Sequence, residues 1–248
     1  SSNIVIAENY DGVYFKRINS TTNETYFELI DFREDNRASY EFVDSIDKVI
    51  DINGEEQTLG NIKYSTLFGG HLNETIEELM VSKGFAENEI GGFGAINKVT
   101  YKDGVEKILG IKPLGLTPSL TEIVIPSTLK VIYGFAGSTN LTTISLLGEA
   151  PALTTISNDA FKNCSKLTNI SALMGEGLTQ IYDGAFSGTG ITSVTLPSTL
   201  QIIGFAGDTS SFATGVFSNC NNLVNVTILS DSKLTLVGKK SFMNTGIT

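Results

Sequence analysis

The chain has 248 residues, a net charge of −10 and 41% hydrophobic residues, which is enough for a substantial core. Residues 1–66 carry 13 acidic against 6 basic residues, whereas residues 67–248 carry 14 against 11. An acidic chain without a basic stripe binds nucleic acids and anionic membranes poorly, so we expect no nucleic-acid partner. No apolar run approaches the roughly 20 residues that cross a bilayer, so no membrane span is expected in this fragment.

Residues 1–66 are predicted to form a β-rich N-terminal cap that grades into degenerate repeats. The segments "YDGVYFKRI" and "TYFELIDF" have the composition of strands, and Asn53-Gly54 is a hairpin turn signal. A separate small binding domain is the alternative. The start, "SSNIVIAENY", lacks the basic and apolar parts of a signal peptide. Because the chain stops at Thr248, just after a repeat anchor, we expect it to be an excised fragment.

Residues 67–248 repeat one block, which reads L-x-x-I-x-[IL], a short break, L-x-x-I, and then A-F. A self-similarity with a period in the twenties is typical of solenoids, whose stacked turns bury one continuous core. Extra residues in one copy can extend outward at a bend without disturbing the stack. The first apolar residues of the blocks are Leu67, Ile96, Leu120, Leu141, Leu167, Ile191, Leu223 and Ile247.

The earliest copy is ambiguous. Counted from Leu67, its strand positions fall on Gly70 and Leu72. The overlapping segment 73–84 has the signals of a short helix, because Asn73 can cap its start and Gly84 can end it. One of these two interpretations has to be partly wrong.

Each I-x-[IL] triplet alternates inward and outward, which is the period of a β-strand. We predict one parallel sheet whose flanking Ile, Val and Leu point into the core. The second apolar pair of each block, such as Leu153 with Ile156, is predicted to pack the opposite wall. The outward side chains, which are the candidate ligand-binding residues, are Lys98, Thr100, Glu122, Val124, Thr143, Ser145, Asn169, Ser171, Ser193, Thr195, Asn225 and Thr227.

The A-F segments predict a ladder of stacked rings from Phe161, Phe186, Phe217 and Phe242. Cys164 and Cys220 occupy one slot two repeats apart, which places them about 10 Å from each other at the strand spacing. A disulfide needs Cα atoms within roughly 7 Å. Since Thr189, Thr245 and Ser138 fill the same slot in other copies, we interpret it as a packing position for small residues rather than a disulfide or metal site.

One connection is longer than the others. Ile203 and Phe217 are 14 residues apart, whereas Ile181 and Phe186 are 5 apart. The extra residues include Phe212, which has no counterpart in other copies. Phe212 either anchors a ligand from an exposed loop around 208–213 or folds back as a plug over the enlarged turn.

The pattern A-F-x-x-C-x-x-L-x-x-I-x-[IL]-P-x-x-L-x-x-I resembles the BspA-like (bacterial surface protein A type) leucine-rich repeat. It is carried by "AFKNCSKL" and "VFSNCNNL" and by the Pro-Ser-Thr-Leu tails at 126–129 and 197–200. The resemblance implies a leucine-rich-repeat solenoid, a right-handed superhelix with short parallel β-strands on the concave face and loops or short helical turns elsewhere. It also implies secreted or cell-surface proteins that bind other proteins, often as adhesins, and it supplies no catalytic residues.

We therefore expect a non-enzymatic, extracellular or cell-surface solenoid that binds a protein ligand, such as a host extracellular protein. The alternative is a structural spacer that presents another domain and has no ligand of its own. No catalytic, cofactor-binding or metal-binding residues are expected, because the one histidine, His71, has no orienting acid and nucleophile assigned to it. We expect a monomer without a cofactor.

Overall fold

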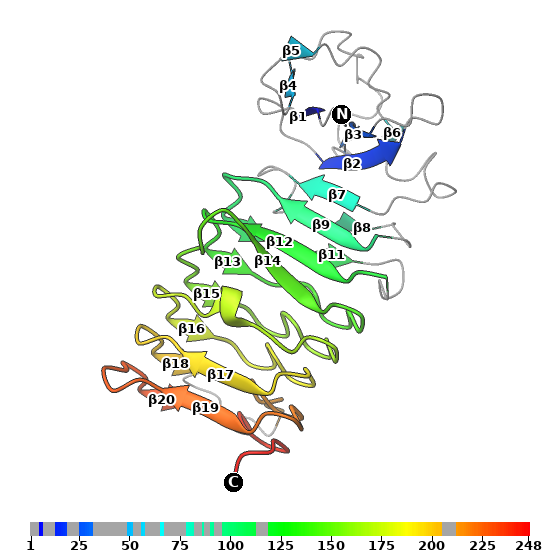
Figure 1. Ribbon diagram of the computed structural model, residues 1–248. Coiled ribbons are helices and arrows are strands. Elements are labelled where there is room, and N and C mark those ends of the chain that lie inside the picture. Colours follow the sequence, from blue (N-terminus) through cyan, green and yellow to red (C-terminus); the bar gives the residue numbers. More distant parts are fainter. Residues whose placement is uncertain are drawn as a thin grey trace.

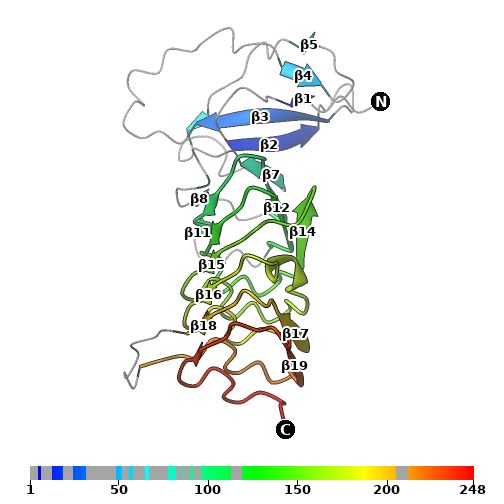
Figure 2. The same ribbon diagram turned by 90° about the vertical axis from the view of Figure 1, so that its left-hand side faces the viewer.

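The computed structural model describes residues 96–110, 119–204 and 212–248 continuously and, outside these ranges, Ala86 and a series of short strands. The chain winds into turns stacked along one axis, with the first strands at one end and the C-terminus at the other (Figures 1 and 2). The turns consist of short strands and loops, and η2 (Ser171–Leu173) is a single turn of 3-10 helix. This is the predicted leucine-rich-repeat solenoid.

One side of the stack, which we call the strand face, carries the I-x-[IL] triplets as parallel strands. In the register of the sheet, Glu122 lies opposite Lys98 and Thr143, which is the pairing that the repeat offsets predict. Two sheets make up this face, and the first continues into the N-terminal strands. The strands of the face are β7 (Glu78–Val81), β9 (Lys98–Tyr101), β12 (Glu122–Pro126), β14 (Thr143–Leu147), β17 (Ser193–Leu196) and β19 (Asn225–Ile228).

The opposite wall is a second, continuous parallel sheet. Each turn contributes two residues to it, and Ile156 of one turn lies opposite Ile132 and Ile181 of its neighbours. The predicted packing of the second apolar pair on this wall is confirmed. Its strands are β10 (Lys107–Ile108), β13 (Val131–Ile132), β15 (Thr155–Ile156), β16 (Gln180–Ile181), β18 (Ile202–Ile203) and β20 (Leu236–Val237), and a separate pair is formed by β8 (Ile90–Gly91) with β11 (Ile111–Lys112).

The N-terminal part contains the predicted strands. β2 (Val13–Ile18) and β3 (Thr25–Asp31) pair antiparallel, and so do β4 (Val49–Asp51) and β5 (Glu56–Gln57). The predicted Asn53-Gly54 turn lies outside the described residues. β1 (Val5–Ile6) pairs with β4, and β6 (Ser65–Thr66) lies parallel to β3. Because β2 also pairs with β7, this β-rich part is joined to the strand face through one sheet.

The first repeat differs from the prediction. β7 pairs in parallel with β9 and sets Leu79 opposite Val99 and Val81 opposite Tyr101. Leu79 and Val81 therefore hold the strand positions that counting from Leu67 had assigned to Gly70 and Leu72. The predicted helix over 73–84 is wrong at 78–81, where two apolar residues with alternate spacing form a strand instead.

The core lies between the two walls and is organised by the predicted ring ladder. Phe135, Phe161, Phe186, Phe217 and Phe242 stack in order, with centroid distances of 5.5 to 5.7 Å and interplanar angles of 2 to 10°. The first four of these side chains are fully buried. The ladder is therefore a continuous apolar column that runs through the turns and ties each to the next.

The slot for small residues lies beside this ladder. Cys164 Sγ donates to the Phe135 carbonyl oxygen at 3.1 Å, and Cys220 Sγ donates to that of Phe186 at 3.0 Å. The hydroxyl of Thr189 donates to the same Phe186 oxygen at 2.9 Å. Both cysteines are buried and free. The side chains in this slot thus satisfy carbonyl groups of the Phe corners, which explains why Cys, Thr and Ser are interchangeable there.

We expect both thiols to resist iodoacetamide in the folded protein. Burial raises the pKa of the Cys164 thiol to about 12 and also raises that of Cys220. An unfolded thiol titrates near 8.5, so above about pH 9 the unfolded state loses protons that the folded state keeps. The contribution of Cys164 to stability should be constant below that pH and should fall by ~1.4 kcal/mol per pH unit as the pH rises toward 12, and Cys220 should act in the same direction.

Urea unfolding between pH 7 and pH 10.5 measures this slope, and Cys164→Ser is the control because it removes one of the two titrating thiols. Reductant should leave the melting temperature unchanged. Rapid alkylation at pH 7, or a melting temperature that drops in reductant, would contradict the packing role of the cysteines.

Candidate functional site: the strand face and its interruption

The strand face is interrupted between β14 and β17. In neighbouring turns the sheet is held by bonds such as that from Thr142 N–H to the Thr121 carbonyl oxygen, at 3.0 Å. At the next two junctions, Thr168 N–H and Thr192 N–H have no such bond to the preceding turn in the described part of the chain. The predicted single sheet is thus wrong, because the turn between the two sheets holds η2 in place of a strand.

One residue of this turn helps to explain the interruption. The spacing does not, because Leu167 and Leu178 are 11 residues apart and so are Leu223 and Leu234, whose copy forms β19. Ala172, however, stands where the other copies place a large apolar residue of the strand. Such a small residue contributes little packing to a strand.

Asn169 gives the backbone of this turn a local alternative to the sheet. Its Oδ1 atom accepts a hydrogen bond from Ser171 N–H at 2.9 Å, and the chain then enters η2. An Asn side chain that bonds to the backbone two residues later stabilises a turn rather than a strand. The two residues predicted to lie on a strand here, Asn169 and Ser171, are exposed but belong to this turn.

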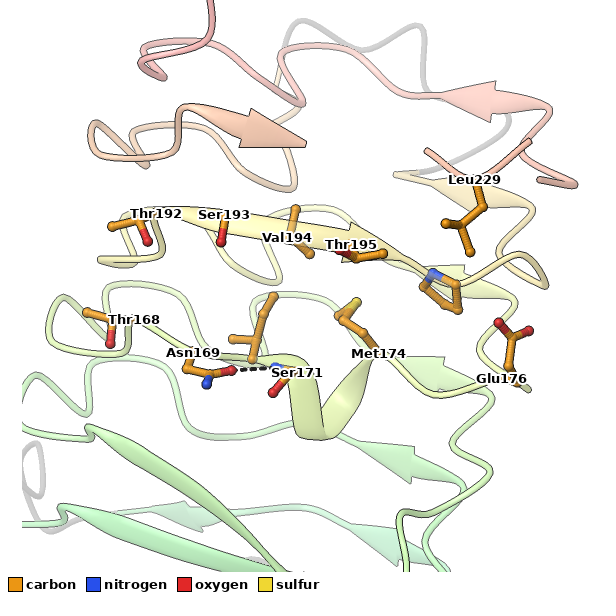
Figure 3. Close-up of a pocket in the computed structure, with 12 residues that line it drawn as sticks. Thr168, Asn169, Ser171, Met174, Glu176, Thr192, Ser193, Val194, Thr195 and Leu229 are labelled. Atoms are coloured by element: carbon orange, nitrogen blue, oxygen red, sulfur yellow. Dashed lines mark hydrogen bonds between the residues drawn. The ribbon is translucent and has the colours of Figure 1, made fainter. Parts of the chain in front are cut away.

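The missing strand leaves a pocket of about 580 Å³ on the strand face. Figure 3 shows Asn169 and Ser171 on the side of η2, with Ser193 and Thr195 facing them along β17. Four of the predicted ligand-binding residues therefore line one hollow. The complete lining comprises Thr168, Asn169, Ile170, Ser171, Met174, Glu176, Thr192, Ser193, Val194, Thr195, Pro197 and Leu229.

The chemistry of this lining suits binding by hydrogen bonds. Six of the twelve lining residues carry a hydroxyl or amide group, and the apolar ones are Ile170, Met174, Val194, Pro197 and Leu229. Glu176 is the ionisable side chain of the lining, and its Oε2 atom accepts a hydrogen bond from Ser198 Oγ at 2.8 Å. The lining combines donors, acceptors and apolar patches.

The other predicted residues of the strand face divide into two groups. On β9, β12 and β14 they bond to one another: Lys98 Nζ lies 3.8 Å from Glu122 Oε2, and Ser145 Oγ donates to Glu122 Oε1 at 2.7 Å. Thr100 lies in register with Val124 and is half-buried. The exposed residues of the face outside the pocket are Thr143, Asn225 and Thr227.

Val124 was predicted to be an outward-facing, ligand-binding residue, and the structure corrects this prediction. It has the expected register, opposite Thr100 and Ser145, but its side chain is only 7% exposed. It lies on the middle strand of three, beside the Glu122–Ser145 hydrogen bond, so neighbouring side chains cover it. Val124 therefore presents little surface to a ligand.

Phe212 lies elsewhere on the coil. Its side chain is 90% exposed, so it does not fold back as a plug. The residues that follow it are fixed, since Asp183 accepts hydrogen bonds from Thr214 N–H and Gly215 N–H at 2.9 and 2.8 Å. This connection leaves β18 on the second wall, so Phe212 is not part of the strand face. Residues 208–211 of the predicted loop lie outside the described residues.

The described ranges contain no group of three or more His, Cys, Asp or Glu side chains arranged to hold a metal ion. Within the same ranges, no helix is both long and apolar enough to span a membrane. His71 lies outside the described residues.

The alternating pattern predicted which side chains point outward, but not the pocket. One signal in the sequence indicates it: the small Ala172 in a strand position. This signal does not show by itself that the turn would also lose its hydrogen bonds to both neighbours.

The comparison with known protein families agrees with this architecture. The model of the BspA type leucine-rich repeat region matches the chain in six copies, over residues 94–206 and 133–248. A leucine-rich cell surface protein of Faecalibacterium prausnitzii A2-165 is similar with a TM-score of 0.46 and 20% identity, over 69% of this chain and 43% of that protein. A leucine-rich repeat protein of Bacteroides ovatus ATCC 8483 has a TM-score of 0.23 and 15% identity, over 83% of this chain and 80% of that one. No curated protein matches the chain.

Proposed function

Because the chain belongs to the BspA-type leucine-rich repeat family, we propose that it is a non-catalytic, extracellular or cell-surface module that binds a protein ligand through its strand face. The observation that carries this proposal is the pocket, which brings Asn169, Ser171, Ser193 and Thr195 together. In this proposal residues 1–66 cap the array, residues 67–248 present the binding surface, and the module acts as a monomer.

The rigid framework of the solenoid supports a role in recognition. The second wall continues across the interruption, because β15 pairs with β16 and β16 with β18. The stacked Phe rings add a rigid column behind the pocket. A preorganised surface loses little conformational entropy on binding, which favours affinity. A ligand would thus meet side chains that are already in place.

The test is to screen the purified protein against immobilised host extracellular proteins and to compare two variants. Thr195→Arg/Thr227→Arg places two long side chains on the strand face, where both threonines are exposed. Gln201→Arg places one at an exposed position next to β18 on the opposite wall. We expect the first variant to weaken binding at least tenfold and the second to leave it unchanged, with both melting temperatures close to that of the parent.

A spacer without a ligand is the alternative function. It predicts that no immobilised protein is retained by the parent or by either variant. Binding that both variants weaken equally would instead show that the strand face is not the recognition surface.

Phe212 is a second proposed contact, because exposed aromatic residues often dominate interfaces. Phe212→Ala should leave the free energy of unfolding within ~0.5 kcal/mol of the parent, since surface substitutions usually have effects of that size. If Phe212 anchors the ligand, its Kd should rise at least tenfold, a loss typical of an interface anchor. An unchanged Kd would remove Phe212 from the interface.

A further inference from the structure

We propose that the edge of β17 beside the pocket binds an extended peptide segment of the ligand through main-chain hydrogen bonds. This inference rests on the proposed function and specifies its recognition mode, the addition of a strand to an open sheet edge.

The direction of the hydrogen bonds in the strand face supports this mode. In a parallel sheet the N–H and C=O groups of alternate residues point to opposite neighbours. Thr143, an outward residue, donates its N–H to the preceding turn, at the Thr121 carbonyl oxygen (3.1 Å). The same alternation directs the N–H and C=O groups of Ser193 and Thr195 toward the turn that holds η2.

At that turn these groups have no strand to pair with. β17 pairs on its other side with β19, and the described residues provide no backbone partner for Ser193 N–H or Thr195 N–H. An exposed row of unpaired strand groups is a template for another chain. Two donors and two acceptors at strand spacing therefore face the pocket.

The exposed side chain of Leu146, on the other side of the interruption, also indicates that a strand is missing. Leu146 on β14 is 40% exposed, whereas Ile125 and Leu196, at the equivalent positions of β12 and β17, are 0% and 2% exposed. Leu146 is uncovered because the following turn carries no strand. The turn with η2 does not take the place of the strand that is missing.

The rest of the pocket restricts the peptide. Pro197 follows the free edge and has no N–H, so pairing ends there. Met174 and Leu229 provide apolar surface for one side chain, and Glu176 disfavours an acidic residue nearby. The ligand segment is therefore short, extended and neutral or basic, with an apolar residue at the Pro197 end.

The probe is a phage-displayed library of random decapeptides, selected on the intact protein, from which one enriched peptide is synthesised. Its Kd is measured on Ser193→Pro, which removes the N–H that points into the pocket, and on Ser193→Ala, which keeps it. We expect Ser193→Pro to bind the peptide at least tenfold more weakly than Ser193→Ala, since both variants lose the hydroxyl and only the first loses the N–H. The melting temperature of Ser193→Pro should barely change, because the lost N–H has no backbone partner in the folded chain.

If Ser193→Pro does not fold, Ser171→Trp is the second variant, since it fills the pocket from the side of η2 without changing β17. It should also weaken peptide binding at least tenfold. Methylation of the peptide nitrogens, one at a time, should weaken binding at alternate positions, as strand pairing requires.

Three results would overturn the peptide inference: no peptide is enriched, the enriched peptide binds Ser193→Pro as well as the parent, or the losses from Ser193→Ala and Ser193→Pro are equal. The proposed function would survive these results if an immobilised protein still binds the parent and Thr195→Arg/Thr227→Arg abolishes that binding. A parent that binds no immobilised protein overturns the proposed function itself.

Discussion

Phe186→Ala should lower the free energy of unfolding by about 3–5 kcal/mol. Phe186 is fully buried and lies between two rings of the ladder, 5.7 Å from the Phe161 ring and 5.6 Å from the Phe217 ring. Its removal takes away the transfer free energy of the ring and leaves a cavity that both neighbours line. Because each turn relies on the next for its core, the turns on both sides of the cavity should be weakened. Urea unfolding followed by circular dichroism measures the loss.

Phe242→Ala is the matched control. Phe242 is half-buried and stacks on Phe217 alone, at 5.5 Å, so its loss should cost clearly less. A cost below 1 kcal/mol for Phe186→Ala, or equal costs for the two variants, would show that the column does not hold the turns together.

Gly134→Ala should destabilise the protein by about 3 kcal/mol or more. Gly134 has a φ of +98°, and a Cβ atom at this position would overlap the Leu109 carbonyl oxygen. The obstacle is backbone of the adjacent turn, so no side-chain rotation can relieve it. Strain at an unfavourable φ costs about 1–3 kcal/mol, and a forced shift of the packing adds about as much again. The melting temperature and the urea midpoint should both fall.

Gly148→Ala separates the two causes. Gly148 has a similar φ of +83°, but a Cβ atom there would meet nothing within 4 Å. It should therefore show the conformational cost alone, roughly 1 kcal/mol. Equal losses for the two variants would mean that the turns move apart easily at Gly134.

Most of the fold could be predicted because each strand position has a physical requirement that shows in the sequence. Val99 and Ile123 have to be apolar, since they lie between the two walls, and the stacked Phe residues recur because a ring column needs a ring in each turn. The start of the array could not be predicted so well. Gly70 and Leu79 both fit an offset of the repeat, and only the pairing of β7 with β9 decides between them.

The candidate site was less predictable for a different reason. Alternation indicates which side chains point away from the core, but exposure also depends on neighbouring turns, as Val124 shows. The pocket arises from hydrogen bonds that are absent at Thr168 and Thr192, and a pattern of apolar residues carries no information about absent bonds. Sequence reasoning therefore found four residues of the pocket without finding the pocket.

The interruption divides the strand face into two platforms with different electrostatics. The platform of β9, β12 and β14 carries the Lys98–Glu122 ion pair, whereas the outward residues of β17 and β19 are uncharged. A ligand that contacts both platforms binds as a bivalent ligand. Because the second wall holds the two platforms at a fixed distance, the first contact raises the effective concentration of the ligand at the second platform. Added salt screens contacts to the first platform and spares those to the second, so a salt titration of binding reports which platform carries the affinity.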